Sequence, residues 1–391
     1  MFYLFLLTAC SDKITQEYDA RKSEILQASP PAPNDWQPDI VVRLQYDAIS
    51  KLSKEILEYE INQLRFTQKV LITNMSLQPK LKVEKWEVTA KNNQIHISAK
   101  FVGSWLYDIA LLSGSENTSI TFDGIAKIEM KDNQIWLSLT SIQKLQVELA
   151  SIQGFDLSNN IEQWLNTQLV KLPPISMGTF DTKSYPIRDI RIHTTAQSQN
   201  IEILSTAKHN QHLPTLSNEI TNDWQAIIHQ QTALHWAQTL AFSKGVISNG
   251  VAIDPVSMKI ADNDFTMDLR LWKIEGVGLW WRDYTTTGTI HRLKNQLKFE
   301  GTSVVEGEKS PKAGLVDPLA LLGEGLILEA IADNLLYSVP TQKKGKLDAG
   351  TWNVQLENFK GVNDTLELSG ALVFTENSKK SSTQPSKLPS K

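Results

Sequence analysis

The fold is decided by residues Ser158–Ile203, which read SNNIEQWLNTQLVKLPPISMGTFDTKSYPIRDIRIHTTAQSQNIEI. The stretch opens with apolar residues at helical spacing, and these are Ile161, Trp164, Leu165, Leu169 and Leu172. The pair Pro173-Pro174 stops this helix, because a proline ring cannot continue it. Strand patterns follow at Ile187–His193 and Ile201–Ile203. The stretch therefore predicts one helix followed by two strands.

The same order of elements returns from Ala320 to Phe374. A helix is predicted over roughly Leu321–Tyr337, within an apolar run, and Pro340 stops it. Strand patterns then follow at Trp352–Phe359 and Leu366–Phe374. The C-terminal part of the chain thus predicts the same helix–strand–strand sequence a second time.

The similarity extends upstream of both stretches. Helix patterns occur at Asp47–Leu57 and Ala226–Phe242, and similar hairpins occur at Gly124–Leu139 and Gly288–Glu300. An offset of about 160 residues is the size of a domain and too long for a solenoid repeat. We interpret the chain as two tandem copies of one α+β domain. The alternative is that two unrelated α+β domains share loose patterns by chance.

This interpretation divides the 391 residues into six parts. They are a lipoprotein signal peptide (1–9), a lipidated cysteine with a flexible tether (10–38), a first barrel-like domain (39–207), a linker (208–222), a second barrel-like domain (223–375) and a disordered tail (376–391).

The N-terminus reads MFYLFLLTAC, an apolar run that ends in the one cysteine of the chain, Cys10. Leu7–Cys10 resembles a bacterial lipobox, and the resemblance implies that Cys10 becomes lipidated and N-terminal. The absence of Lys or Arg before the apolar run departs from the pattern. By resemblance to lipoproteins of Gram-negative bacteria, Ser11 after the cysteine implies the outer membrane, facing the periplasm. The alternative is a buried N-terminal strand with a free thiol.

Composition and motifs exclude several classes of function. A formal net charge of −4 gives no basic surface for nucleic acid. One cysteine excludes an internal disulfide and a cysteine-based metal site. The sequence contains no phosphate-binding loop, dinucleotide fingerprint or hydrolase elbow. We therefore expect no enzyme activity, no cofactor and no metal.

Strands with alternating polarity complete the pattern. In Gln94–Val102 and in Phe265–Leu271, apolar and polar residues alternate, so one face of each strand is predicted to be buried. The overall order of elements resembles the tubular lipid-binding superfamily, whose members are BPI-like and SMP-like proteins. The resemblance covers about residues 39–375 and implies, in each copy, a highly twisted antiparallel sheet wrapped around a long helix, with an apolar tunnel.

The resemblance implies that apolar residues on the two late helices line a ligand cavity. The candidates are Trp164, Leu165 and Leu169 in the first copy and Leu326, Ile327, Ile331 and Leu335 in the second. The sequence leaves open whether the interior is hollow or solid. A hollow interior predicts an envelope lipoprotein that binds or transfers a lipid or other apolar ligand. A solid one predicts a scaffold lipoprotein for a periplasmic protein or cell-wall partner.

Overall fold

The computed structural model of the chain describes most of its residues. They are residues 2–27, 32, 34–70, 73–92, 94–109, 112–132, 134–149, 151–152, 154–179, 187–205, 213, 220–248, 250–276, 278–293, 296–311, 342–346 and 350–376.

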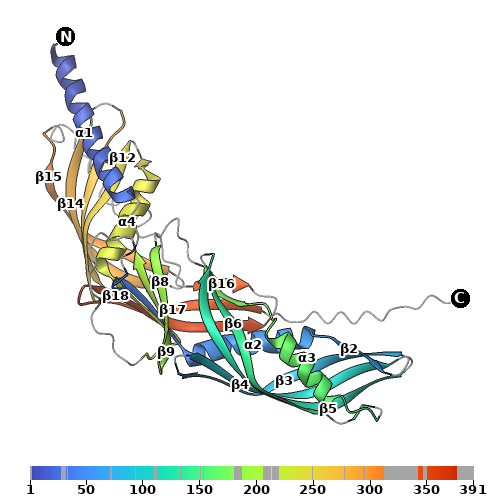
Figure 1. Ribbon diagram of the computed structural model, residues 1–391. Coiled ribbons are helices and arrows are strands. Elements are labelled where there is room, and N and C mark those ends of the chain that lie inside the picture. The colour runs from blue at the N-terminus through green and yellow to red at the C-terminus, as the bar shows by residue number, and fades with distance from the viewer. Residues whose placement is uncertain are drawn as a thin grey trace.

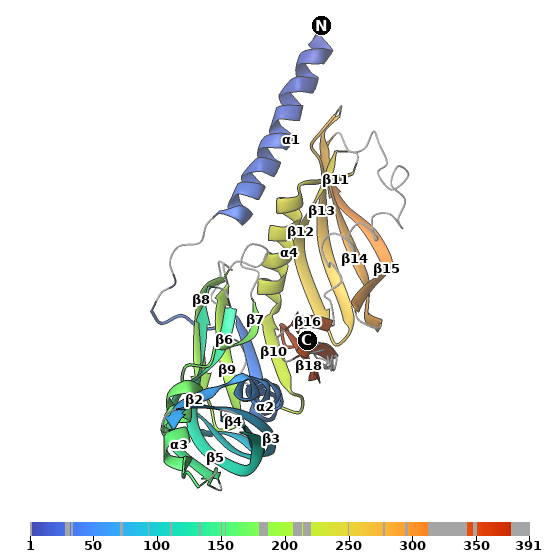
Figure 2. The same ribbon diagram turned by 90° about the vertical axis from the view of Figure 1, so that its right-hand side faces the viewer.

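The described residues form three antiparallel sheets in an elongated molecule (Figure 1). A six-stranded sheet and a five-stranded sheet lie at opposite ends, and a seven-stranded central sheet lies between them. Figure 2 shows the same arrangement from the side, with the N-terminus at the end that holds the five-stranded sheet. We call residues 40–205 the first half and residues 224–376 the second half.

The first half begins with a strand and a helix that lead into the six-stranded sheet. Its elements are β1 (Ile40–Gln45), α2 (Tyr46–Gln63), β2 (Phe66–Val70), β3 (Thr73–Lys91), β4 (Gln94–Ile109), β5 (Leu112–Lys131), β6 (Gln134–Leu149), α3 (Ser158–Leu169), β7 (Ile175–Thr179), β8 (Ile187–Thr194) and β9 (Ser198–Ser205). Strands β2 to β7 form the sheet in chain order.

The second half begins in the same way and leads into the five-stranded sheet. Its elements are β10 (Trp224–His229), α4 (Gln230–Lys244), β11 (Val246–Ser248), β12 (Val251–Ala261), β13 (Asp264–Lys273), β14 (Trp280–Leu293), β15 (Gln296–Lys309), β16 (Gln342–Lys346), β17 (Gly350–Val362) and β18 (Thr365–Glu376). The helix predicted over Ala226–Phe242 therefore starts late, because β10 occupies its first residues.

The central sheet takes strands from both halves, in the order β16-β17-β18-β10-β1-β9-β8. The first strands of the two halves, β1 and β10, pair antiparallel in its middle, with Val42 opposite Ala226. The last strand of each half, β9 or β18, pairs with the first strand of the same half. Apart from the additional edge strand β16, the strand order is therefore symmetric about the β1–β10 pair, and the two halves share one sheet.

The predicted fold class, an α+β fold with two sheets each wrapped around a long helix, is wrong. The described residues are mostly antiparallel β-structure, and no long central helix lies inside a sheet among them. In the first half, strand side chains fill the interior themselves: Phe101, Trp105 and Phe122 are each 0% exposed. Helix α3 is 12 residues long. The long helix predicted over Leu321–Tyr337 falls outside the described residues.

Asp39 joins the two halves just before β1. Its backbone N–H donates to the oxygen of Ile203, and its own oxygen accepts from the N–H of His229. Its carboxylate accepts from the Ser205 N–H at 2.9 and 3.2 Å. Burial raises the pKa of Asp39 to about 6, although the hydrogen bond from Ser205 acts in the opposite direction.

An N-terminal helix, α1 (Phe2–Leu26), packs against the second half. The buried side chains of Ile14, Tyr18 and Ile25 face that half, and the Tyr18 ring lies 5.6 Å from Phe242 and 5.9 Å from Trp272. The flexible tether predicted for residues 10–38 is therefore helical as far as Leu26, because these apolar residues find a partner surface.

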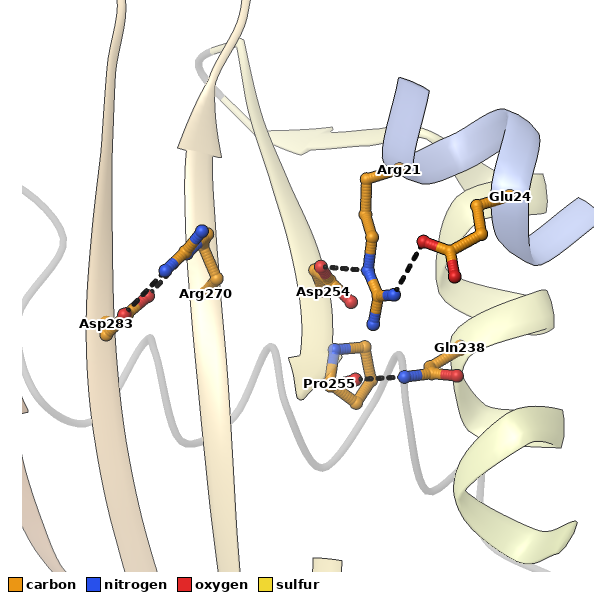
Figure 3. Close-up of polar contacts among 7 residues, drawn as sticks. All are labelled: Arg21, Glu24, Gln238, Asp254, Pro255, Arg270 and Asp283. Atoms are coloured by element: carbon orange, nitrogen blue, oxygen red, sulfur yellow. Dashed lines mark hydrogen bonds and ion pairs between the residues drawn. The ribbon is translucent and has the colours of Figure 1, made fainter. Parts of the chain in front are cut away.

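An ion pair also holds α1 in place. Figure 3 shows Arg21 on α1 reaching Asp254 on β12, with Nε and Oδ2 3.2 Å apart. Burial raises the pKa of Asp254, and the charge of Arg21 opposes this shift. Next to it, Arg270 on β13 pairs with Asp283 on β14 at 2.6 Å.

Within the described residues, none of the helices has the length and apolarity to span a membrane.

Candidate apolar-ligand site

Helix α2 crosses the open edge of the six-stranded sheet and is fixed there by hydrogen bonds. Strand β2 pairs with β3 only between Thr73 and Leu77. Farther along β3, Asn62 donates to the Leu81 oxygen at 2.9 Å and accepts from the Leu81 N–H at 2.7 Å. Glu58 accepts from the Val83 N–H at 2.9 Å. These side chains satisfy backbone groups of an edge strand and hold the C-terminal turns of α2 on the sheet.

The remaining face of α2 forms one wall of an apolar slot that opens to solvent. The lining residues are Ser53, Ile56, Leu57 and Glu60 of α2, Trp86, Ile97, Ala126, Leu137 and Leu139 of the sheet, and Leu172, Pro173 and Ile175 from the segment after α3 and from β7. Ten of these twelve side chains are apolar, and Ser53 and Glu60 are the polar ones. The slot is therefore chemically suited to a hydrocarbon chain with a polar end.

The enclosed part of the slot has a volume of about 30 Å³, which is roughly the volume of one water molecule in the liquid. A hydrocarbon chain can enter only if side chains on α2, or α2 itself, move outward. At the N-terminal end of α2, the Tyr46 hydroxyl lies 2.6 Å from the backbone oxygen of Thr195 and 3.0 Å from that of Ser198. An ion pair between the exposed Lys51 and the mostly buried Asp223, 2.7 Å apart, lies at that end.

Trp86 gives the slot a polar feature. Its ring lies 6.3 Å from the rings of Phe101 and Phe122. Its indole nitrogen is buried and has no hydrogen-bond partner among the described residues. A buried N–H without an acceptor is costly. A ligand with a carboxylate or carbonyl oxygen would provide that acceptor.

The structure places the predicted site residues of the first copy beside the slot, outside its lining. Leu165 and Leu169 are 1% and 2% exposed and belong to the core of the first half. Trp164 is half-buried and packs on Phe66 and Trp105, with ring centroids 5.3 and 6.5 Å away. The predicted residues of the second copy, Leu326, Ile327, Ile331 and Leu335, lie outside the described residues.

Sequence reasoning missed most of the slot. Leu172 is a predicted helix position and Ile56 lies within the predicted helix Asp47–Leu57, yet their meeting in space depends on contacts between distant segments. The side chain of Cys10 lies outside the described residues, while its backbone is part of α1. Among the described residues, no group of three or more His, Cys, Asp or Glu side chains is arranged to hold a metal ion.

No protein-family model matches the chain, and no curated protein matches it. Among solved structures, the chain is similar to lipopolysaccharide binding protein, with 12% identity over 87% of this chain and 100% of that chain and a TM-score of 0.38. It is also similar to P47 of Clostridium botulinum E1, with 11% identity over 86% and 99% and a TM-score of 0.36.

A third similarity is to P47 from Clostridium botulinum A2, with 10% identity over 85% of this chain and 97% of that chain and a TM-score of 0.32. With TM-scores below 0.5, these similarities assign neither an activity nor a ligand to this chain.

Proposed function

We propose that the protein is a non-enzymatic carrier that binds a long-chain apolar ligand between α2 and the six-stranded sheet. The observation that carries the proposal is Trp86, which lines an apolar slot and whose buried indole N–H lacks an acceptor among the described residues. The alkyl chain would lie against Leu57, Ala126 and Leu137. Each buried methylene would contribute about 0.8 kcal/mol.

Local opening of the slot is part of this proposal. Both ends of α2 stay fixed, through Tyr46 at the N-terminal end and through Asn62 and Glu58 at the C-terminal end, while the side chains that line the slot move apart. Binding would then replace contacts between α2 and the sheet by contacts between each of them and the ligand.

We further propose that the carrier is tethered to the bacterial cell envelope through a lipid on Cys10, at the outer membrane facing the periplasm. The support is the sequence Leu7–Cys10 and the following Ser11. Metabolic labelling with a clickable fatty acid should label the wild type and leave Cys10→Ser unlabelled. Equal labelling of both proteins would contradict the proposed tether.

The ligand proposal is tested with a matched pair of tryptophan variants. Trp86 and Trp105 both carry a buried indole nitrogen without a hydrogen-bond partner among the described residues, and only Trp86 lines the slot. Binding of a fluorescent long-chain fatty acid to Trp86→Phe should be roughly tenfold weaker, because a hydrogen bond to a charged group is lost.

Trp105→Phe is the control and should retain the wild-type affinity. Thermal unfolding of both variants shows whether each is folded. Absence of fatty-acid binding by the folded wild type, or equal weakening by the two substitutions, would contradict the proposed site.

A further inference from the structure

Helix α1 presents one stripe of side chains to the second half. Ile14, Tyr18, Arg21 and Ile25 follow one another at intervals of three or four residues, which places them on one face of the helix. The three apolar members of the stripe are buried, and Arg21 pairs with Asp254 on β12. The stripe therefore docks α1 on the second half from Ile14 to Ile25.

The surface beneath α1 is apolar. It consists of Phe242, Ala252, Trp272 and Leu279, which form one cluster with the three apolar side chains of α1. Phe242 is 0% exposed and Trp272 is 3% exposed. Without α1 these side chains would face water, and folded monomers rarely expose a large apolar patch that no partner covers. The docked position of α1 is therefore the stable one in the folded protein.

The five-stranded sheet has one end at the central sheet and one free end. At the turn between β12 and β13, Asp262 and Gly361 of β17 exchange backbone hydrogen bonds of 2.9 and 2.8 Å. The last residue of β13, Lys273, lies at the opposite end of the strand, which we call the free end. Figure 2 shows α1 projecting past this end.

The contacts of α1 agree with this direction. Asp254 stands opposite Arg270 in the pairing of β12 with β13, and Trp272 lies two residues nearer the free end. Arg21 contacts Asp254, whereas Tyr18, about one turn earlier in α1, contacts Trp272. The N-terminus of α1 therefore points toward the free end and beyond it.

This direction places Cys10 beyond the free end. Cys10 precedes Tyr18 by eight residues, which is about 12 Å along a helix. Trp272 is the next to last residue of β13, so only about 3.4 Å of strand follow it. The slot belongs to the first half, whose six-stranded sheet lies at the opposite end of the molecule (Figure 1).

The chain after α1 is attached a second time, to β8. Trp36 is 1% exposed, and its indole N–H donates to the Asp189 carboxylate at 2.8 Å. The Arg191 guanidinium lies 4.1 Å from the centre of the Trp36 ring and donates to the backbone oxygens of Asn34 and Trp36. Trp36 therefore stays fixed on the central sheet whether or not α1 is docked.

We propose that α1 is an orienting arm, through which a lipid on Cys10 holds the free end of the second half at the membrane surface and keeps the slot away from that membrane. The inference rests on the proposed lipid on Cys10, and it requires no ligand in the slot. With α1 undocked, the 25 residues 11–35 would separate the lipid from Trp36 and span at most roughly 80–90 Å. The first half would then reach the membrane.

The test uses the lipidated protein, purified from bacterial membranes and reconstituted in phosphatidylcholine vesicles that contain an acceptor lipid. Because the lipid blocks the Cys10 thiol, one introduced cysteine is the single free thiol and carries a donor dye. Glu275→Cys labels an exposed position at the free end, and Lys85→Cys labels an exposed position next to Trp86 of the slot. Energy transfer to the membrane should be strong from residue 275 and weak from residue 85. Equal transfer from both, or stronger transfer from residue 85, would overturn the proposal.

A pair of double variants tests whether α1 sets this orientation. Tyr18→Ser with Arg21→Ser removes docking contacts and should raise the transfer from residue 85 toward that from residue 275. Asp19→Ser with Ser23→Ala changes exposed positions of α1 and should leave both transfers unchanged. Thermal unfolding shows whether each variant is folded. No change with the first pair, or equal changes with both pairs, would contradict orientation by α1.

The mass of the purified protein separates this proposal from that of the tether. A mass without lipid would contradict the tether and the orienting arm together. A lipidated protein with equal transfer from residues 275 and 85 would contradict the orienting arm alone.

Discussion

In each half, a helix side chain is hydrogen-bonded to the backbone of an edge strand in the same manner. In the first half, Asn62 on α2 bonds to both backbone groups of Leu81 on β3. In the second half, Gln230 on α4 bonds to both backbone groups of Ile260 on β12. Both edge strands also contain a bulge, at Val83/Lys85 and at Pro255/Ser257, and a helix side chain bonds next to each.

The interiors of the two halves differ. The first half encloses Phe101, Trp105 and Phe122. The second half encloses polar groups along β14: Arg282 is 3% exposed and pairs with Glu306 at 3.1 Å, and Thr286 is 0% exposed. Two similar antiparallel sheets therefore enclose different interiors, one apolar and one partly polar. We therefore place the proposed apolar ligand in the first half.

The largest effect is expected from truncating a core aromatic residue. Phe122→Ala should lower the free energy of unfolding by about 3–5 kcal/mol, because it leaves a cavity. Phe265→Ala is the matched change in the second half, where Phe265 is 4% exposed. Since β1 and β10 pair in one sheet, both substitutions should lower the midpoint of the same urea transition. Two transitions, each sensitive to one substitution, would show that the halves unfold independently.

The next largest effect is on the pH dependence of stability, and it comes from Asp39, which joins the two halves. Its pKa in the folded protein is about 6, above the ordinary value of about 3.9. The fold therefore favours the protonated form, and this contribution to stability is present below about pH 4 and lost as the pH rises through 6. The difference amounts to about 3 kcal/mol.

Asp39→Asn tests this pH dependence. The variant should be relatively more stable at pH 7 than at pH 4, compared with the wild type, when urea unfolding is measured at both values. Asp47→Asn, at an exposed position on α2, is the control. If the stability difference between Asp39→Asn and the wild type is the same at pH 4 and pH 7, Asp39 does not titrate as described.

The smallest effect is expected from the two amide side chains that fix the edge strands. Gln230→Ala should cost about 2 kcal/mol and Asn62→Ala about 1 kcal/mol, because the bonds of Gln230 are fully buried and those of Asn62 only partly. Hydrogen exchange should speed up at the Ile260 and Leu81 amides, respectively. Asn166→Ala on an exposed position of α3 should change neither rate. A larger loss of stability for Asn62→Ala than for Gln230→Ala would contradict the predicted order.

Local elements were predictable where the sequence pattern was strong. The periodicity of Ile161, Leu165 and Leu169 corresponds to α3, and the alternation in Gln94–Val102 corresponds to part of β4. The predicted helix at Asp47–Leu57 lies within α2. These patterns are set by contacts between residues close in sequence, so a single sequence shows them.

The arrangement of these elements was not predictable in the same way. Pairing of β1 with β10 joins residues about 186 positions apart, such as Val41 and Ile227, and no local pattern specifies it. Packing of α1 depends on Tyr18 meeting Phe242 and Trp272. The slot depends on Ile56, Ala126 and Leu172 meeting. Duplication of the two halves, and lipidation of Cys10, stay predictions.

The central claim is that an apolar ligand occupies the slot of the first half. The most direct measurement is native mass spectrometry of the full chain with Cys10→Ser, purified under mild conditions, together with Ala126→Leu and Ala99→Leu in the same background. Both alanines are buried in the same sheet, at 2% and 4% exposure, and only Ala126 lines the slot. We expect an added mass of one long-chain ligand on the parent protein and Ala99→Leu, and its loss from folded Ala126→Leu. Ligand-free protein throughout, or ligand retained by Ala126→Leu, would contradict the claim.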